Sequence, residues 1–340
     1  MANAKNSVKT MKVLKKKPGE ISAVLTPAKS RKPAKAYVAV ARATVLVAEQ
    51  KRAASPIYLE QVELFDSPAT LPRTRSSKRI AFGWYGGKFS HLDWLLPLLP
   101  TAHHYCEPYS GSGAVLLNRT PSAVETYNDI DGDVANFFRV LRDRGEELIR
   151  AIALTPFSRE EFHLAIVGVE QGISDVERAR RFYVRARQAR TGLAQTATIG
   201  RWANCKNTSR AGMSGAVSRW LGGVEALEGI AARLLRVQIE NRPAVDVIRL
   251  YDHKDTLFYC DPPYLHETRG DTKAYGFEMT EAEHWELAET VAQCVGKVAV
   301  SGYRCAPMDT WYKGWRRFDT PMKSIHSTKQ LRQESVWMNY

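Results

Sequence analysis

A carboxylate and two prolines directly follow a short apolar run in "TLFYCDPPY", residues 256–264. Proline lacks the N–H that a strand ladder needs, so the run should end in a rigid corner. Asp261 and the carbonyl of Pro262 offer two acceptors that suit an amino group, and the Tyr264 ring can stack on the heterocycle that carries it. The tetrapeptide therefore predicts a site that holds a nucleobase while its exocyclic amine is modified, although alone it could also be a strand-ending turn.

A glycine loop, "EPYSGSG" at residues 107–113, precedes that tetrapeptide in the chain. Gly111 and Gly113 would let the backbone approach a ligand closely and point helix amides at it. Asp129 ends the next predicted strand, where an acid can accept hydrogen bonds from a ribose. Together they predict a nucleoside-containing cofactor, and both NAD and S-adenosylmethionine remain open on this ground.

A third motif, "WYGGK" at residues 84–88, places two glycines and Lys88 before a short amphipathic segment that prolines end. Glycines at such a place let the chain turn sharply, and a lysine can face a ligand or the solvent. Taken alone, the motif is as consistent with an ordinary turn and a surface lysine as with a ligand site.

Strands and helices alternate around these motifs. Residues 103–118 have the pattern of a strand, a glycine loop and a helix, and residues 122–131 that of a strand ending in acids. A helix and a further strand, at 297–303, follow the tetrapeptide. This alternation predicts an α/β fold with a parallel, doubly wound, Rossmann-like sheet. The terminal "ESVWMNY" is predicted to be an edge strand.

Residues 155–245 interrupt the alternation and predict an inserted, mainly helical lobe. Ser158 and Glu161 form a capping-box pattern at its first helix, and a polar, basic stretch at 191–215 is typical of a loop. The predicted parts are a basic extension at 1–79, a cofactor-binding first part of the catalytic domain at 80–154, the lobe at 155–245, and a catalytic second part at 246–340.

Positive charge is concentrated in two places. The chain has 49 Lys and Arg against 36 Asp and Glu, a net charge of +13, and residues 1–36 carry ten basic residues and one acid, or +9. That extension is predicted to be either a disordered tail or an arm that grips DNA. Between Arg178 and Arg219 stand nine Arg, one Lys and no acid, whereas solvated faces mix signs. This stretch predicts a nucleic-acid-binding surface in the lobe.

Composition favours a cytoplasmic protein without a metal site. Hydrophobic residues make up 44% of the chain, and no apolar run approaches the roughly 20 residues of a membrane span. No secretory signal is predicted at the N-terminus. The five cysteines are scattered and form no C-x-x-C pair, so neither a zinc knuckle nor a disulfide framework is predicted.

From about Ile80 to Tyr340 the chain resembles the Dam-like family of adenine-N6 DNA methyltransferases. The resemblance rests on the order of "WYGGK", "EPYSGSG", the acid-ended strand with "NDID", the basic insert, "DPPY" and the closing "VWMNY". It implies a Rossmann-like methyltransferase whose inserted lobe recognises the target. It also implies transfer of a methyl group from S-adenosylmethionine to N6 of an adenine flipped out of double-stranded DNA.

The resemblance also assigns roles to individual residues. It implies cofactor contacts from Trp84, Lys88, Glu107, Pro108, Tyr109, Gly111, Gly113, Asp129, Ile130 and Asp261. It implies catalytic roles for Asp261, Pro262 and Tyr264. Tyr275 and Phe277 fall where the family closes the pocket with aromatic rings. His284 also matches a family position, but we expect it first to cap or pack a helix.

Target recognition is expected in the lobe. The polar segment "RWANCKNTSR" (201–210) is predicted to read base edges, through Arg201, Lys206 and Arg210. Arg185 and Arg187, on the preceding helix, are predicted to contact phosphates. We expect double-stranded DNA as the partner and no membrane. The expected protein is a monomer or a homodimer that acts on the nucleoid of a bacterial or phage-infected cell.

Other functions stay open beside this one. A cytosine-N4 methyltransferase would use the same kind of acceptors and stacking ring, but the resemblance would then favour Ser in place of Asp261. An enzyme acting on protein glutamine or RNA would favour Asn there. A non-catalytic DNA-binding protein is disfavoured because Lys88, Asp129, Asp261 and Tyr264 are all present. A C5-cytosine enzyme would need a Pro-Cys motif, which does not occur, and an NAD oxidoreductase would leave "DPPY" unexplained.

Overall fold

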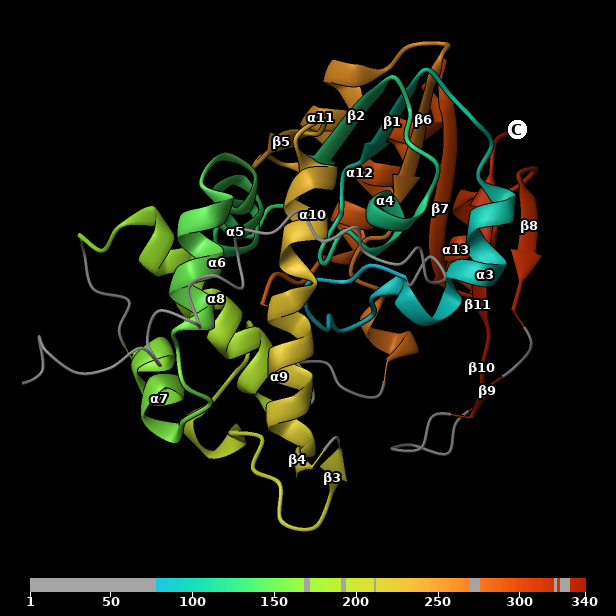
Figure 1. The fold of residues 1–340 in the computed structure, drawn as a ribbon. Helices are drawn as coiled ribbons and strands as arrows, with labels where there is room; N and C mark the ends of the chain where they lie inside the picture. The colour runs from blue at the N-terminus through green and yellow to red at the C-terminus, as the bar shows by residue number, and fades with distance from the viewer. Residues whose placement is uncertain are drawn as a thin grey trace, which may run out of the picture. The chain divides into compact units, whose positions relative to one another are not determined.

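Seven strands form one sheet in the described part of the unit Arg75–Tyr340 (Figure 1). The computed structural model describes residues 78–167, 172–190, 194–210, 212–269, 276–320, 323–324 and 331–340. The sheet order is β5-β2-β1-β6-β7-β11-β8. The bounds are β1 (His104–Glu107), β2 (Val124–Asn128), β5 (Gln238–Glu240), β6 (Thr256–Cys260), β7 (Lys297–Tyr303), β8 (Arg316–Asp319) and β11 (Glu334–Met338). Strands β5 to β7 in this order are parallel, which confirms the predicted α/β, Rossmann-like class.

The prediction that the last strand lies at an edge is wrong. Strand β11 runs antiparallel between β7 and β8, with Val336 opposite Ser301 on one side and Phe318 on the other. All five residues of β11 are buried, as expected of an interior strand. The strand that covers it, β8, has the sequence "RRFD", whose two arginines hide the apolar pattern that marks a strand.

Successive side chains along each strand point to opposite faces, and each face has its own core. Tyr105, Leu257 and Tyr259 lie in the first core, whereas Cys106 and Phe258 lie in the second. The first core is covered by α3 (Leu92–Leu95), α4 (Ala114–Asn118), α5 (Gly132–Asp143) and the helices of the lobe. The second is covered by α11 (Ala244–Tyr251), α12 (Glu281–Ala292) and α13 (Ala306–Trp311). The sheet is therefore doubly wound, as predicted.

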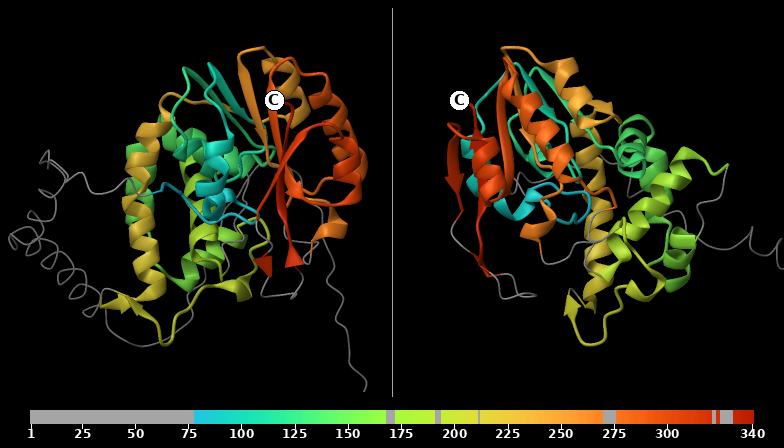
Figure 2. Two further views of the ribbon diagram at one scale, coloured as in Figure 1. Left: turned by 90° about the vertical axis from the view of Figure 1, so that its right-hand side faces the viewer. Right: turned by 180° about the vertical axis from the view of Figure 1, so that it is seen from behind.

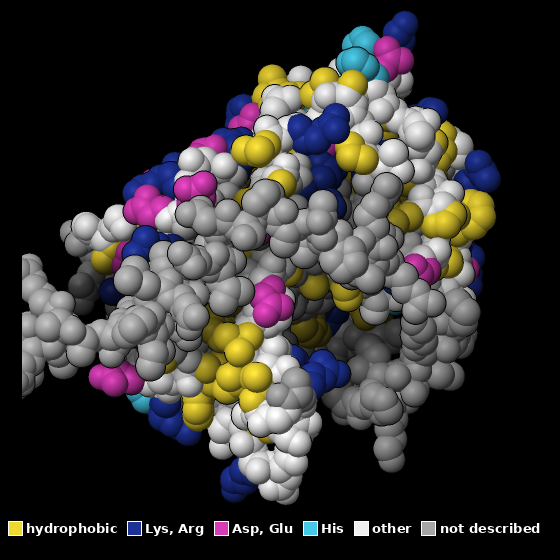
Figure 3. Space-filling model, viewed as in Figure 1, with side chains coloured by type: hydrophobic (Ala, Val, Ile, Leu, Met, Phe, Trp, Pro, Cys, Tyr) yellow, Lys and Arg dark blue, Asp and Glu magenta, His cyan; other side chains and the backbone are white. Residues whose placement is uncertain are grey.

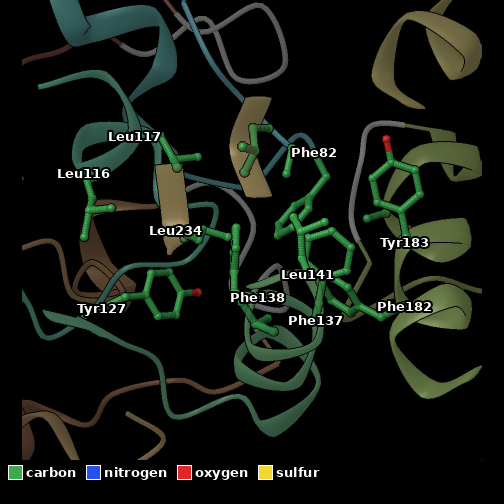
Figure 4. Packing of buried hydrophobic residues seen from close by; sticks show 14 of the residues in the cluster. Phe82, Leu116, Leu117, Tyr127, Phe137, Phe138, Leu141, Phe182, Tyr183 and Leu234 are labelled. Atoms are coloured by element: carbon green, nitrogen blue, oxygen red, sulfur yellow. The ribbon is translucent and has the colours of Figure 1, made fainter. Parts of the chain in front are cut away.

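The lobe packs on the helical layer of the sheet (Figures 1 and 2). Its elements are α7 (Arg159–Val167), α8 (Asp175–Gln188), α9 (Gly215–Glu225), α10 (Leu227–Leu234), β3 (Ser209–Arg210) and β4 (Met213–Ser214), and α6 (Gly145–Ala153), which ends before residue 155, packs against α8. Tyr183 of α8 stacks on Phe137 of α5, with ring centroids 5.6 Å apart (Figure 4). Ser158 Oγ accepts from the N–H of Glu161 at 3.1 Å, as the capping pattern predicts. The predicted range 155–245 also contains β5, which pairs with β2 in the sheet.

Shorter elements complete the described chain. A pair of two-residue strands, β9 (Lys323–Ser324) and β10 (Leu331–Arg332), precedes β11, and four 3-10 turns connect larger elements. The turns are η2 (Lys88–His91), η3 (Leu96–Leu98), η5 (Ile199–Arg201) and η6 (His266–Thr268). No helix in the described residues is both long and apolar enough to span a membrane.

Candidate active site

Polar side chains gather where the parallel strands end. Glu107 ends β1, Asp129 directly follows β2, Asp261 directly follows β6, and Ser301 lies near the end of β7. The carboxyl ends of parallel strands meet at one edge of a sheet, which is where α/β proteins bind ligands. The fold thus brings the glycine loop and the "DPPY" tetrapeptide to the same edge.

Asp261 is held by two donors. Lys88 Nζ lies 2.7 Å from its carboxylate, and Ser301 Oγ donates to Oδ1 at 2.7 Å. Burial raises the pKa of Asp261, and the Lys88 ammonium opposes that rise. A carboxylate has about four lone-pair sites, so Asp261 keeps acceptor capacity for a ligand.

Lys88 is only 3% exposed and lies between two carboxylates. Its Nζ donates to the carbonyl of Gly86 at 2.7 Å, and it lies 2.7 Å from Asp261 and 3.2 Å from Glu334. Burial lowers the pKa of Lys88, but the charges of Asp261 and Glu334 outweigh burial and leave this pKa raised. The three acceptors match the three N–H donors of the ammonium group. Lys88 is therefore the charge partner of Asp261, and its contact with a cofactor stays a prediction.

Tyr264 is oriented by its hydroxyl group. The hydroxyl donates to Glu334 Oε1 at 2.8 Å, and Lys88 Nζ lies 4.9 Å from the ring centroid. The edge-on ring of Tyr303 packs against it, with centroids 4.8 Å apart. Tyr264 is 6% exposed, so its ring is largely covered in this structure.

The backbone of the loop after β1 requires its two glycines. Gly111 has φ +51°, and a Cβ there would collide with the indole of Trp84. Gly113, with φ +62°, forms the N-cap of α4. Tyr127 OH donates to the carbonyl of Gly111 at 2.7 Å. These contacts bring Trp84 of the "WYGGK" motif against the glycine loop.

Asp129 stands beside this loop. Its Oδ2 accepts from the N–H of Gly111 and its Oδ1 from the N–H of Asp131, both at 2.8 Å. Burial raises the pKa of Asp129 to about 7, and the two amide hydrogen bonds oppose that shift. The next residue, Ile130, is 45% exposed and can pack on a flat ring.

A cavity of about 360 Å³ opens at this edge. Seven predicted cofactor residues line it: Trp84, Pro108, Tyr109, Gly111, Asp129, Ile130 and Asp261. Five carboxylates line it too, namely Asp129, Asp261, Glu278, Glu283 and Glu286, and no Lys or Arg is among the lining residues that the structure describes. Three of the five pair with cations outside the lining: Asp261 with Lys88, Glu286 with Arg249 and Glu278 with Arg269. The cavity therefore favours a cationic ligand over an anionic one.

A smaller cavity of about 30 Å³, roughly the volume of one water molecule, adjoins the first. Lys88 and Glu107 line it, and Trp84, Tyr109, Gly111 and Asp261 border both cavities. Burial raises the pKa of Glu107 to about 8, and Tyr105 OH donates to Glu107 Oε1 at 2.6 Å. All predicted cofactor residues except Gly113 thus line one of the two cavities.

Other predicted residues have different positions. Pro262 is buried, and neither it nor Tyr264 lines either of these two cavities, although Pro263 between them lines the larger one. Phe277 lines the larger cavity, whereas Tyr275 is outside the described residues. His284 is a buried packing residue: it stacks on Trp311, and burial lowers its pKa to about 4. The cap of α12 is Thr280 instead.

The predicted DNA-binding residues fall into two groups. Arg185 contacts Asp133 at 2.6 Å and the carbonyl of Ala165 at 2.8 Å, and Arg187 donates to the carbonyl of Arg219. Arg201, Lys206 and Arg210 are exposed, and none of them has an ion pair among the described residues. On the face in Figure 3, Lys and Arg are scattered, with acids beside several of them. The structure thus exposes the side chains of Arg201, Lys206 and Arg210, whereas it engages Arg185 and Arg187 in contacts within the protein.

Sequence reasoning missed three residues of the site. Glu334 and Ser301 are polar residues in mostly apolar strands, which was an available signal. Gln195 left no such signal, because it lies in a polar loop. Its Nε2 donates to Asp131 Oδ2 at 2.6 Å, its Oε1 accepts from the N–H of Gly276 at 2.9 Å, and it lines the larger cavity. Among the residues the structure describes, no group of three or more His, Cys, Asp or Glu could hold a metal ion.

Two curated proteins are similar to this chain. A DNA N-6-adenine-methyltransferase of Escherichia phage P1 is 26% identical over 216 residues, which cover 62% of this chain and 27% of that protein. The chain thus spans little more than a quarter of that relative. The Type II methyltransferase M1.LlaDCHI of Lactococcus lactis subsp. cremoris is 27% identical over 238 residues, which cover 64% of this chain and 76% of that protein.

A solved structure and a family model also match. The rRNA methyltransferase aviRa from Streptomyces viridochromogenes aligns with a TM-score of 0.31 and 13% identity, over 72% of this chain and 80% of that one. That score is too low to support an argument. The family model for D12 class N6 adenine-specific DNA methyltransferase matches residues 84–333, which include all three motifs. These matches confirm the predicted family, and the chain belongs to the D12 class N6 adenine-specific DNA methyltransferases.

Proposed function

We propose that this chain transfers a methyl group from S-adenosylmethionine to N6 of an adenine flipped out of double-stranded DNA. The observation that carries the proposal is the placement of Asp261. Its carboxylate borders both cavities and lies 2.7 Å from the Lys88 ammonium. A charged acceptor at the edge of a cofactor-sized cavity is what an amine nucleophile needs beside a methyl donor.

The charge of the cavity supports S-adenosylmethionine as the cofactor. This molecule carries a sulfonium and an ammonium group, which suit a lining of five carboxylates of which three have a cationic partner among the described residues. NAD carries two phosphates, which would meet repulsion there. Asp129 is the proposed ribose acceptor, and Ile130 is the proposed contact of the adenine ring. S-adenosylmethionine supplies an electrophilic methyl group when bound.

Asp261 and Pro262 are proposed to activate the amine by accepting hydrogen bonds from it. The N6 lone pair of adenine is conjugated into the ring and is a poor nucleophile. Hydrogen bonds from N6 to the Asp261 carboxylate and the Pro262 carbonyl favour a more tetrahedral nitrogen, whose lone pair can point at the methyl carbon. The N–C bond would form as the S–C bond breaks, which releases S-adenosylhomocysteine, and N6 would then lose one proton to water. Such in-line transfer needs positioning and electrostatics and no covalent enzyme intermediate.

A base in a duplex cannot reach Asp261, so the adenine has to leave the stack. The ring of Tyr264 is the proposed stacking surface. Because only 6% of Tyr264 is exposed, an entering base must displace a neighbour to contact the ring.

The lobe is the proposed DNA-binding part. Arg210 lies in β3 and Lys206 lies three residues before that strand, whereas Arg201 ends η5; all three are exposed. In Figure 1 the β3–β4 hairpin lies at the end of the unit toward which the arrow of β6 points. Arg185 and Arg187 keep their proposed phosphate contacts only if they give up the protein contacts described above. The relatives from a phage and a bacterium favour a cytoplasmic enzyme that acts on the nucleoid.

The test is to identify the product. Plasmid DNA from cells that express the chain should contain N6-methyladenine in one sequence context, and DNA from cells that express Asp261→Ala should not. N4-methylcytosine in its place, or no modified base with a folded wild-type protein, would contradict the proposal.

A further inference from the structure

Glu334 is a charged residue in the interior of the sheet. It begins β11 and is 8% exposed. Strand β11 is antiparallel to β7, so it runs opposite to the strands that carry the other site residues. Its backbone is fixed, because its carbonyl accepts from the N–H of Thr320 at 2.8 Å. A buried carboxylate is costly unless it is paired, so the partners of Glu334 indicate why it is there.

Those partners are residues of the proposed reaction. Oε1 accepts the hydroxyl hydrogen of Tyr264 at 2.8 Å and lies 3.2 Å from Lys88 Nζ. Oε2 lies 3.6 Å from His91 Nε2. One oxygen thus fixes both the stacking ring and the charge partner of Asp261.

This arrangement removes freedom from both partners. The Tyr264 ring is held at its hydroxyl end by Glu334 and on its surface by Lys88 and Tyr303. Lys88 is held between two carboxylates, so it cannot turn away from Asp261 without leaving Glu334. Small displacements of groups that position a substrate can cost about a hundredfold in rate.

We propose that Glu334 is a positioning residue for methyl transfer, which orients the Tyr264 ring and the Lys88 ammonium around the target base. The proposal rests on the proposed function of the same site. It assigns to the last strand of the sheet a part in the reaction, through two side chains that Glu334 contacts directly.

The experiment measures single-turnover methylation of a duplex by wild type, Glu334→Ala, Tyr264→Phe and the double variant. Glu334→Ala should lower the rate about a hundredfold and Tyr264→Phe about tenfold, with little change in the dissociation constant of S-adenosylmethionine. The double variant should be no more than about threefold slower than Glu334→Ala, because both changes remove the same contact. Glu334→Gln should retain more activity than Glu334→Ala, since its amide oxygen still accepts from Tyr264.

Ser335→Ala is the matched control. Ser335 is the buried neighbour on β11, and its hydroxyl donates to Asp319, outside the site. Its rate should stay at the wild-type value. Rates of Glu334→Ala and Glu334→Gln within about threefold of wild type, or losses that multiply in the double variant, would overturn the inference. Should Glu334→Ala not fold, Glu334→Gln with Tyr264→Phe decides by the same criteria. If the folded wild type makes no N6-methyladenine, the proposed function fails instead.

Discussion

Two regions of this molecule are rich in charge, and they use it differently. At the carboxyl edge of the sheet, the buried Lys88 lies between the half-buried Asp261 and the buried Glu334, so one ammonium pairs with two carboxylates at 2.7 Å and 3.2 Å. In the lobe, Arg178 and Arg185 of α8 pair with Asp133 on α5 and Arg180 pairs with Glu161 on α7, whereas Arg201 on the following segment stays exposed. The comparison teaches that an acid-free stretch of sequence is not a free positive surface, since its partners can come from elsewhere in the fold.

The largest effect is expected when Lys88, the cation between Asp261 and Glu334, is replaced by a neutral residue. Lys88→Gln should lower the single-turnover rate at neutral pH by about a hundredfold or more. Since Lys88 opposes the rise of the Asp261 pKa, its loss raises that pKa further, and more of Asp261 is protonated at a given pH. The acid limb of the rate profile should therefore move to higher pH. Lys78→Gln, which removes a surface pair with Asp93, is the control, and an unmoved limb would contradict the role of Lys88.

Exposed lobe residues should give the next largest effects. Replacing a base-reading residue among Arg201, Lys206 and Arg210 by Ala should cost about 1–3 kcal/mol on the preferred site and relax preference at one base. Replacing a phosphate contact should weaken binding to all sequences and reduce the slope of log K against log[salt] by about 0.9. Arg144→Ala, which breaks a surface pair with Glu147, is the control. Unchanged affinity and preference in all three variants would remove the lobe as the recognition element.

Arg185 tests the difference between the two regions, because it is a basic lobe residue that is already ion-paired within the protein. Arg185→Gln loses its pair with Asp133 and should reduce the free energy of unfolding by about 1–3 kcal/mol. The salt slope of DNA binding should stay as in wild type. Denaturant unfolding and binding at several salt concentrations check both parts. A smaller slope with unchanged stability would instead restore Arg185 as a phosphate contact.

The smallest effect is expected from the basic extension. Deletion of residues 1–70 should leave the site preference and single-turnover rate unchanged, because all three motifs lie after Ile80. Loss of the rate in a folded truncated protein would make the extension part of the active unit.

The meeting of Gly111, Asp129 and Asp261 at the carboxyl edge of the sheet could be predicted because they follow strands that alternate with helices. Each follows a strand of the parallel sheet, and such positions converge by topology. Glu334 could not be predicted in this way, since its strand is antiparallel and is covered by the short, arginine-rich β8. The acid-free sequence around Arg185 predicts a DNA contact, but its ion-pair partner Asp133 lies on another helix and cannot be found from that stretch alone.

The most direct test of the central claim compares wild type with Asp261→Asn in single-turnover methylation of one defined duplex. Asn keeps the size of the side chain and loses the charged acceptor beside Lys88. Asp255→Asn, on the exposed turn before β6, is the matched control. We expect Asp261→Asn to bind DNA and cofactor but to form N6-methyladenine at least a thousandfold more slowly, whereas Asp255→Asn keeps the wild-type rate. A rate for folded Asp261→Asn within about tenfold of wild type would contradict the account.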